Sequence, residues 1–313
     1  MNIFITGSEG FIGHHLAKAL VMAGYDVTCG VLYNSNLDIG NLKYWGIGRN
    51  AMQFKTIFFD IRDKNSYQHQ VNNSDVIIHL AGLIDVAYSY SSYNQYYETN
   101  VFGTLQLLDS IIKSTNDPRL LYISSSEVYG TPVTTPISED FPLNPQSPYA
   151  ASKASADLLV QSFVKSFDIN AVIIRLFNTF GARQSSRAII PYLIEQYRLP
   201  DKELQIGNII PRRDFNHISD TVAGIILVMG KIKTFEIINI GSGKMFSIET
   251  LIQYMEKISY KHKTIKINQD RVRPKNSEVM ELQADISKAK RLLGYEPKAD
   301  LYEEIFRLWN YEG

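Results

Sequence analysis

The fold is decided by the stretch Thr6-Gly7-Ser8-Glu9-Gly10-Phe11-Ile12-Gly13, which follows a short apolar segment at 2–6 and opens a helical pattern at 11–23. Gly7 permits a tight turn, Gly10 lets the backbone approach a pyrophosphate, and Gly13 lets the helix pack closely on the strand. The N-terminus of the helix adds unpaired amides and the positive end of a dipole. This context predicts a dinucleotide-binding loop, and the alternative is an ordinary strand–turn–helix connection.

Short apolar segments alternate with amphipathic ones through the first part of the chain. The predicted strands are Asn2–Thr6, Asp26–Leu32, Gln53–Phe59, Val76–Leu80, Leu120–Ser124 and Ala171–Leu176. Helical periodicity predicts helices over Phe11–Ala23, Val101–Lys113 and Tyr149–Phe167. Strands that are apolar throughout are typical of a parallel sheet covered on both faces. We therefore expect an α/β fold, a doubly wound parallel sheet of the Rossmann type with helices on both faces.

After residue 177 the alternation loosens, and we interpret Pro191, Pro200 and Pro211 as breaks in it. A further strand is predicted at Phe235–Ile240 and helices at Ser247–Lys257, Ser287–Leu293 and Leu301–Tyr311, with Gly294 as a C-cap. We expect two domains: residues 1–176, with the strand near 235–241, would bind the dinucleotide, and the remainder of 177–313 would bind the substrate. The segment Thr131–Pro148, rich in Pro, Thr and Asn, is predicted to be a surface connection.

Composition excludes several classes of protein. The 32 basic and 32 acidic residues give a formal net charge of +0, which argues against a partner that is a nucleic-acid polymer. The sequence contains no run of 18 apolar residues, so no membrane helix is predicted, and no secretory signal is predicted at the N-terminus. Cys29 is the only cysteine, and we expect it to be a core residue of a cytoplasmic protein without disulfides. The six histidines show no metal-binding spacing, so no metal is expected.

Tyr149 and Lys153 lie four residues apart and therefore share one helix face. A free tyrosine, with a pKa near ~10, is a poor base at neutral pH. A lysine ammonium and an oxidised nicotinamide ring nearby would favour the phenolate, which can then take a proton from a substrate hydroxyl. Alone, such a pair is more often a surface feature. The glycine loop in the same chain favours the catalytic interpretation here.

The run Ser124-Ser125-Ser126-Glu127-Val128-Tyr129-Gly130 follows a predicted strand directly. Ligands of open parallel sheets bind beyond the carboxyl ends of the strands, so this run stands where chemistry is expected. Ser125 is a candidate donor to the reacting oxygen of the substrate, and Glu127 is a candidate base for a C–H made acidic by a neighbouring ketone. Alternatively the serines cap the next segment and Glu127 is solvated.

The residues after the second and third strands concern the adenosine half of a dinucleotide. An acidic residue at the end of the second strand usually binds the ribose 2′-hydroxyl, but the sequence there is Tyr33-Asn34-Ser35-Asn36. No arginine replaces it for a 2′-phosphate, so the sequence does not separate NAD from NADP. Asp60 is a candidate partner of the adenine amino group, or the N-cap of the following helix.

Together these motifs resemble the extended short-chain dehydrogenase/reductase superfamily, and within it the sugar-nucleotide 4,6-dehydratases that act on N-acetylhexosamines in legionaminic-acid-type pathways. The similarity runs over nearly the whole chain, through TGSEGFIG, FFDIRD, HLAG, ETNVFGT, SSSEVYG, NPQSPYAASKASAD, RLFNTFGARQSSRAIIP, RRDFNHISD and LLGYEPK. It implies a bound NAD(P) contacted by Gly7, Gly10, Phe11, Ile12, Gly13, Asn34, Asp60, Ile61, Leu80, Ala81, Gly82, Thr99, Tyr149 and Lys153.

The resemblance also implies catalytic roles. Tyr149 would be the base at the hexose C4 hydroxyl, Lys153 would orient the nicotinamide ribose, Ser125 would bind O4, and Glu127 would remove the C5 proton. Many dehydratases have Asp where this chain has Ser126, which leaves the general acid open; Glu127 could serve as both base and acid, acting through the Ser126 hydroxyl or through a water. Substrate contacts are implied for Ser125, Asn178, Arg187, Arg213 and Arg273.

We therefore expect an NAD(P)-dependent 4,6-dehydratase of a nucleotide sugar, with UDP-N-acetylglucosamine as the first candidate substrate. UDP-glucuronate decarboxylases keep a similar Ser–Ser–Glu run, whereas 4-epimerases usually lack a carboxylate at the position of Glu127, and both activities remain alternatives. A dinucleotide-sensing Rossmann protein is the non-enzymatic alternative. Relatives commonly form homodimers or higher homo-oligomers through the helix that carries Tyr149.

Overall fold

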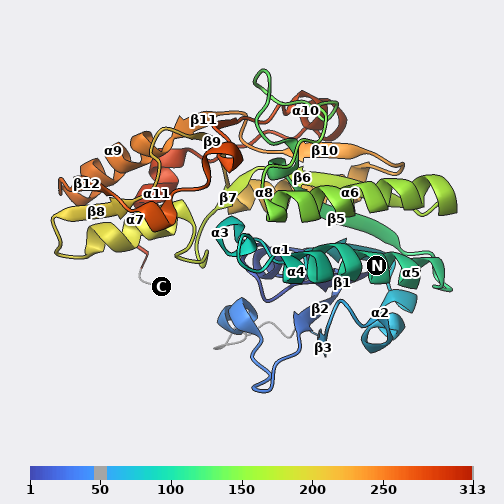
Figure 1. Ribbon diagram of the computed structural model, residues 1–313. Helices are drawn as coiled ribbons and strands as arrows, with labels where there is room; N and C mark the ends of the chain where they lie inside the picture. Colours follow the sequence, from blue (N-terminus) through green and yellow to red (C-terminus); the bar gives the residue numbers. More distant parts are fainter. Residues whose placement is uncertain (46–54, 312–313) are drawn as a thin grey trace. The chain divides into compact units, whose positions relative to one another are not determined.

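The computed structural model describes residues 1–45 and 55–311, which form two compact units (Figure 1). Unit 1 comprises Met1–Ser125, Pro148–Arg175 and Ile225–Ile238, and unit 2 comprises Ser126–Ser147, Leu176–Gly224 and Asn239–Gly313. The segment after Ser125 and the end of the chain thus belong to the same unit. The domain boundary at 176 and the separate tasks of the two domains stay predictions.

A seven-stranded sheet runs in the order β10-β6-β5-β4-β1-β2-β3. Its strands are β1 Asn2–Thr6, β2 Asp26–Leu32, β3 Lys55–Phe59, β4 Val76–His79, β5 Arg119–Ser125, β6 Ala171–Leu176 and β10 Ile237–Ile240. β1 pairs in parallel with both β2 and β4, and the strand order reverses between β1 and β4. This confirms the predicted α/β Rossmann fold, and ligands of such sheets bind at that reversal. All seven predicted strands exist; Gln53 and Phe54 of the third lie outside the described residues.

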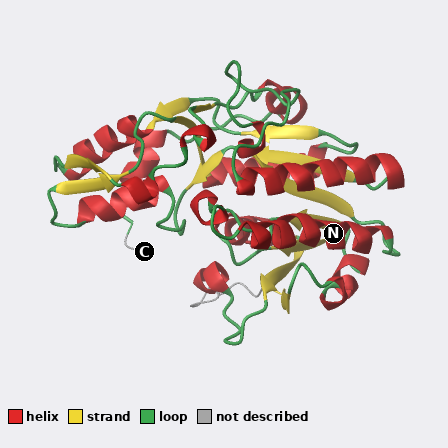
Figure 2. Cartoon of the chain, in the orientation of Figure 1, coloured by secondary structure: helices red, strands yellow, loops and turns green. Residues whose placement is uncertain are grey.

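The helices are drawn red in Figure 2. In unit 1 they are α1 Phe11–Met22, α2 Gln68–Asn72, α3 Val86–Ser89, α4 Tyr93–Tyr96, α5 Gly103–Ile112 and α6 Pro148–Phe167, and the end of α8 Ile218–Lys231 joins them. Three of them, α1, α5 and α6, correspond to predicted helices, and the short α2, α3 and α4 were not predicted. The helix predicted to begin at Val101 begins as α5 at Gly103, because a π-helical turn, Tyr97–Phe102, precedes it. π-Helical turns are often found at functional sites.

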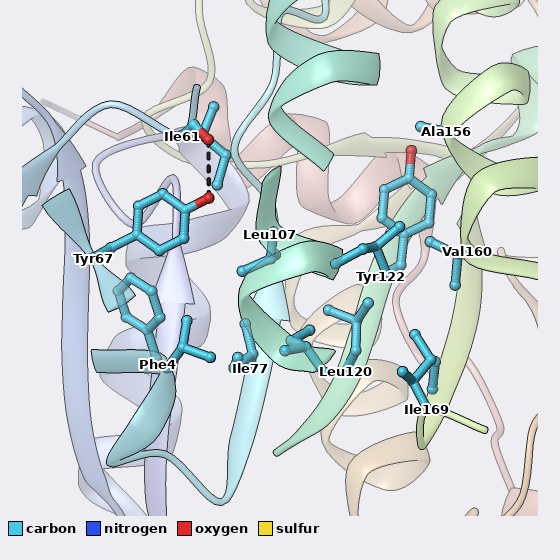
Figure 3. Close-up of a cluster of buried hydrophobic side chains, with 14 of the residues drawn as sticks. Phe4, Ile61, Tyr67, Ile77, Leu107, Leu120, Tyr122, Ala156, Val160 and Ile169 are labelled. Carbon is cyan, nitrogen blue, oxygen red and sulfur yellow. Dashed lines mark hydrogen bonds between the residues drawn. The ribbon is translucent and has the colours of Figure 1, made fainter. Parts of the chain in front are cut away.

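Both faces of the sheet are apolar, because neighbouring residues of a strand point to opposite faces. On one face Phe4, Ile77 and Leu120 form a buried cluster with Leu107 of α5 and Val160 of α6 (Figure 3). Ile3 and Ile5 alternate with Phe4 and are 1% and 0% exposed. Helix α1, with Leu16 and Leu20 fully buried, packs on β1 and β2. Each such side chain contributes roughly 1.5–3 kcal/mol, so the strands and helices stabilise each other.

Unit 2 contains two smaller sheets. β9 Arg212–His217 pairs with β7 Asn178–Phe180, β11 Met245–Ser247 and β13 Glu281–Leu282, and β8 Glu203–Ile206 pairs with β12 Thr264–Ile267. Its helices include α7 Ile189–Arg198, α9 Ile248–Ser259, α10 Ser287–Leu293 and α11 Leu301–Trp309. Leu193, Leu251 and Ile305 lie in its apolar core.

One expectation for unit 2 was wrong. Pro191 does not end the regular structure, because it lies in the first turn of α7, where its missing N–H is not needed. The segment Thr131–Pro148 is mostly exposed or half-buried, as predicted for a surface connection, and it is anchored at Ile137. Ile137 is 0% exposed, and its N–H donates to the Gln283 carbonyl. The left-handed Gly294 ends α10 as predicted.

None of the helices in the described part of the chain combines the length and apolar character that crossing a membrane requires.

We expect Gly13→Ala to destabilise the protein by about 2–3 kcal/mol, because a Cβ there would lie 2.2 Å from the Gly7 carbonyl oxygen. Gly230→Ala is the matched control: it lies in α8 with nothing within 4 Å of its Cβ position, so it should be neutral or stabilise by up to about 1 kcal/mol. Urea denaturation of both variants measures the difference. Equal stabilities would contradict the close approach.

Candidate active site

The glycine loop adopts the geometry that its sequence predicts. Gly7 has a φ of +73°, and a Cβ there would lie 2.8 Å from the Ala81 nitrogen. Gly10 is exposed and caps α1 without a side-chain bond. The first N–H groups of α1, beginning at Phe11 and Ile12, have no acceptor within the helix and are available to an anion. The loop therefore suits the pyrophosphate of a dinucleotide.

An open pocket of about 410 Å³ adjoins the end of β2 and is lined by Glu9, Val31, Leu32, Asn34, Asn36, Asp38 and Gly40. Asn34, a predicted cofactor contact, uses its side chain to close its own loop: Nδ2 donates to the Leu32 and Asp38 carbonyls, and Oδ1 accepts from Asp38 N–H. Glu9 Oε1 accepts from Leu32 N–H at 3.1 Å, while Glu9 Oε2 is buried and has no hydrogen-bond partner. An orphaned buried acceptor beside the glycine loop fits a ligand that carries hydroxyl groups.

Asp60 follows β3 and is bound by Arg62, whose Nη2 lies 2.6 Å from Asp60 Oδ2. The side-chain hydrogen bond from Arg62 holds the pKa of Asp60 below its usual value. Asp60 is not the N-cap of the next helical turn, because Asp63 accepts from Asn65 N–H there. Ile61, also predicted to contact the cofactor, is 4% exposed, and its carbonyl accepts from Tyr67 (Figure 3). An adenine contact by Asp60 stays a prediction.

A buried polar network joins the ends of β1 and β4. The Thr6 hydroxyl lies 2.8 Å from His79 Nδ1 and accepts from Ala81 N–H, and His79 Nε2 lies 3.1 Å from the Thr104 hydroxyl. Burial lowers the pKa of His79 to about 3, so its imidazole is neutral. His79 is thus a structural residue that holds the backbone of Leu80, Ala81 and Gly82 beside the glycine loop.

Asn100 is a positioning residue that the motifs had not singled out. It is 2% exposed; its Oδ1 accepts from Leu83 N–H, and its Nδ2 donates to the Leu83 carbonyl and to Ser152 Oγ. Ser152 Oγ in turn donates to the Tyr149 carbonyl. The first turn of α6 is therefore tied to the loop after β4. The neighbouring Thr99, predicted to bind the cofactor, is half-buried. The structural feature that marks Asn100 is the π-helical turn Tyr97–Phe102, in which it lies.

Tyr149 and Lys153 lie in the first two turns of α6, 8% and 9% exposed. Lys153 Nζ donates to the Ile123 carbonyl at 2.5 Å and lies 4.6 Å from the centre of the Tyr122 ring. Burial lowers the pKa of Lys153 to about 8, although the Asp157 carboxylate opposes that shift. Ser125, half-buried, ends β5 two residues after Ile123. Unit 1 therefore brings Lys153 against the strand that carries Ser125.

Asp157, on the same helix, is a second residue that the motifs had not singled out. It is 0% exposed and forms a buried ion pair with Arg175, with 3.0 Å between Asp157 Oδ2 and Arg175 Nε. Ser124 Oγ donates to the same carboxylate. These contacts hold α6 against β5 and β6. Removing one partner of the ion pair would leave an uncompensated buried charge.

Ser126 and Glu127 open unit 2 in the helical turn Ser126–Tyr129 and are 2% and 8% exposed. The turn is closed by Gly130, which has a φ of +60° and whose N–H donates to the Glu127 carbonyl. A Cβ at Gly130 would lie 1.9 Å from the Asn144 carbonyl oxygen, so only glycine fits. Glu127 is thus a buried carboxylate on a rigid turn rather than a solvated one.

Glu127 belongs to a charged cluster within unit 2. Arg273 Nη1 lies 3.4 Å from Glu127 Oε1, and Arg213 Nη2 lies 3.4 Å from Glu278 Oε1. Burial lowers the pKa of Arg213, and the charges of Glu127 and Glu278 oppose that shift. The structure therefore brings together three predicted residues: Glu127, Arg213 and Arg273. The cluster pairs two guanidinium groups with two carboxylates, Glu127 and Glu278, and guanidinium groups suit a ligand with phosphate groups.

The two remaining predicted substrate residues lie elsewhere in unit 2. Asn178 is half-buried and begins β7, where it pairs with Phe215. Arg187 is exposed in the turn before α7, and its backbone N–H donates to Ser185 Oγ. Their roles stay predictions.

Comparisons with a family model and with individual proteins point to the same family. The model of the GDP-mannose 4,6-dehydratase family matches residues 4–307. A curated relative, the uncharacterized UDP-glucose epimerase YtcB of Bacillus subtilis, is 33% identical, over 97% of this chain and 96% of its own.

Two solved structures illustrate the range of activities among similar proteins. UDP-glucuronic acid 4-epimerase from Bacillus cereus, in complex with UDP-glucuronic acid and NAD, has a TM-score of 0.88 and 32% identity, covering 99% of this chain and 98% of its own. The dTDP-glucose 4,6-dehydratase DesIV from Streptomyces venezuelae, with NAD bound, has a TM-score of 0.89 and 26% identity, covering 99% and 96%.

The depressed pKa of Lys153 predicts a pH-dependent stability difference. Folded Lys153 loses its proton near pH 8, whereas the unfolded residue keeps it up to about 10.5, so the unfolded state binds more protons in that range. The stability of the nucleotide-free protein should therefore rise relative to a Lys153→Met variant by about 2–3 kcal/mol between pH 7 and pH 10. Urea denaturation at several pH values measures it. A difference that is constant with pH would contradict the buried ammonium.

Proposed function

The chain belongs to the GDP-mannose 4,6-dehydratase family of nucleotide-sugar dehydratases and epimerases, and from this membership we propose that it is an NAD(P)-dependent 4,6-dehydratase of a nucleotide sugar. UDP-N-acetylglucosamine is the first candidate substrate. The observation that carries the proposal is Glu127, a buried carboxylate on a rigid turn directly after Ser125 and Ser126.

The residues of unit 1 fit the dinucleotide that this reaction needs. The exposed Gly10, the free N–H groups at the start of α1 and the orphaned Glu9 carboxylate oxygen support its binding. The nicotinamide would accept a hydride from C4 of the hexose and return it to C6. Lys153, fixed by the Ile123 carbonyl, would stabilise the phenolate of Tyr149 on the same helix.

Two proton transfers would be carried out by this chain's own residues. Tyr149 takes the proton of the C4 hydroxyl as the hydride leaves C4, and Ser125 holds the same oxygen by a hydrogen bond. The resulting 4-ketone acidifies C5–H, and Glu127 removes that proton while the C6 hydroxyl leaves as water. The hydride is added to C6, and C5 takes a proton from solvent, which is balanced by the proton that Tyr149 took from the C4 hydroxyl and releases; the product is the 4-keto-6-deoxy sugar. The sum of the steps is the loss of one water.

The departing C6 hydroxyl needs a proton, and Ser126 stands where many dehydratases carry Asp. A serine hydroxyl is too weak an acid to supply a proton by itself. We propose that Glu127 both removes the C5 proton and delivers it to the leaving group, with Ser126 as a hydrogen-bonding relay. Arg213 and Arg273 would bind the diphosphate of the substrate by charge-assisted hydrogen bonds.

The second candidate is an epimerisation at C4. A similar protein, the UDP-glucuronic acid 4-epimerase that is 32% identical to this chain, supports it. That reaction needs Tyr149 and Lys153 but no base at C5. A decarboxylase of UDP-glucuronate is a third candidate. NMR of the products from UDP-N-acetylglucosamine, GDP-mannose, dTDP-glucose and UDP-glucuronate distinguishes them. A product that keeps its C6 hydroxyl, or released carbon dioxide, would overturn the dehydratase. Bound cofactor with no turnover of any substrate would favour a dinucleotide sensor.

We expect Glu127→Gln to lower the rate of 4-keto-6-deoxy sugar formation by about 10²–10⁴-fold, because the base at C5 is lost. Tyr149 is intact in this variant, so oxidation at C4 should continue and reduced nicotinamide should accumulate during a single turnover. Tyr149→Phe should prevent both events. Absorbance of the reduced nicotinamide and NMR of the sugar measure the two steps.

The matched control is Glu281→Gln, which removes an exposed carboxylate of unit 2 that is paired with Arg212. It should leave both steps unchanged, since exposed ion pairs contribute little. Full dehydratase activity in Glu127→Gln would exclude the assigned base.

A homodimer also stays a prediction. Phe102 and Leu158, 46% and 55% exposed, are apolar residues that such an association through the helices of unit 1 would cover.

A further inference from the structure

The pocket at the end of β2 holds a carboxylate, although the residues that follow β2 include none at the expected place. In dinucleotide-binding sheets, an acidic residue at that point binds the adenosine ribose hydroxyls. Here Glu9 comes from the glycine loop, and its Oε1 accepts from Leu32 N–H, the last residue of β2. The carboxylate thus reaches the same location from a different strand–helix connection.

The loop after β2 is built around this side chain. Asn41 N–H donates to the Glu9 carbonyl, and a Cβ at Gly40, which has a φ of +56°, would lie 2.8 Å from Glu9 Cβ. Any larger residue at Gly40 would push the loop away from Glu9. The position of Glu9 is therefore fixed by contacts on both sides of the pocket.

Two polar side chains that line the pocket, Asn34 and Asp38, already form hydrogen bonds within the loop. Both N–H groups of the Asn34 amide donate within the loop, and Asp38 Oδ1 accepts from Gly40 N–H. Glu9 Oε2 is shielded from water and has no partner, and burial raises the pKa of Glu9. Because χ3 of glutamate is a soft torsion, the carboxylate can present either oxygen to the pocket that it lines. A pair of hydroxyl donors would satisfy it.

The charge of the pocket favours the same kind of ligand. Its described lining includes two carboxylates, Glu9 and Asp38, and two amides, Asn34 and Asn36, but no lysine or arginine. Among these described lining residues, a phosphate on the ribose would meet a partly buried carboxylate and no cation, which is unfavourable in a poorly solvated site.

We propose that Glu9 is the residue that selects the cofactor: it accepts hydrogen bonds from the adenosine ribose hydroxyls and excludes a 2′-phosphate, so that this protein uses NAD rather than NADP. The inference rests on the proposed function, because it needs a dinucleotide in unit 1.

The test is the binding of NAD and NADP to the full-length protein, freed of nucleotide and titrated by calorimetry. The unaltered protein should bind NAD at least about 100-fold more tightly than NADP. Glu9→Gln keeps the length of the side chain and an oxygen for Leu32 N–H. This variant should weaken the binding of NAD about 5–20-fold. It should reduce the preference for NAD over NADP at least about 10-fold. The ratio of the two constants is the informative quantity, because a change in stability alone affects both nucleotides equally.

Asp26→Asn is the matched control, since it removes an exposed carboxylate at the opposite end of β2 that pairs with Lys55. It should leave both constants unchanged. Equal binding of NAD and NADP to the unaltered protein, or a preference that persists in Glu9→Gln, would overturn the role of Glu9 while leaving the dehydratase intact. Binding of neither nucleotide would instead refute the proposed function, and this inference with it.

Discussion

The close approach of Gly13 to the Gly7 carbonyl oxygen is the constraint on which the nucleotide-binding half of the structure depends. With 2.2 Å between that oxygen and an added Cβ, α1 can begin at Phe11 only if residue 13 is glycine. The start of α1 in turn fixes where its free N–H groups point and where Glu9 leaves the loop. One backbone contact therefore determines both the pyrophosphate cradle and the position of the carboxylate at the end of β2.

A series of neutral, buried hydrogen bonds extends this constraint to α6. Thr6 contacts His79, His79 contacts Thr104, and Thr104 donates to the carbonyl of Asn100, whose side chain reaches Ser152. Buried polar groups cost free energy unless they are paired, so each member specifies the position of the next. The helix carrying Tyr149 and Lys153 is thereby held relative to the ends of β1 and β4 without any charge that titrates near neutral pH.

Prediction from sequence succeeded where burial follows the local periodicity or composition of the segment. Strands such as Val76–His79 are apolar on both faces because helices cover both, and that composition is visible in the sequence. In unit 2 the helices α9, α10 and α11 were predicted in the same way, but its short strands carry no such signal. In β9, Arg213, Asp214 and Asn216 are polar yet buried, because distant segments supply their partners: Ser242, Gly243 and Ala284 donate N–H groups to Asp214. The periodicity of a short sequence does not contain those partners.

The sequence by itself determined the chemical groups and their local spacing: the glycines after β1, the Tyr149–Lys153 pair on one helix face, and Glu127 two residues after the end of β5. Only the tertiary structure decided which charges are buried and which are paired. Glu127 meets Arg273 across 146 residues, Glu9 reaches Leu32 across 23, and Lys153 is desolvated against β5. The physical reason is that spacing along a helix or strand is a local property. The electrostatic state of a side chain depends instead on how completely the folded chain excludes water around it and which distant charge it brings near.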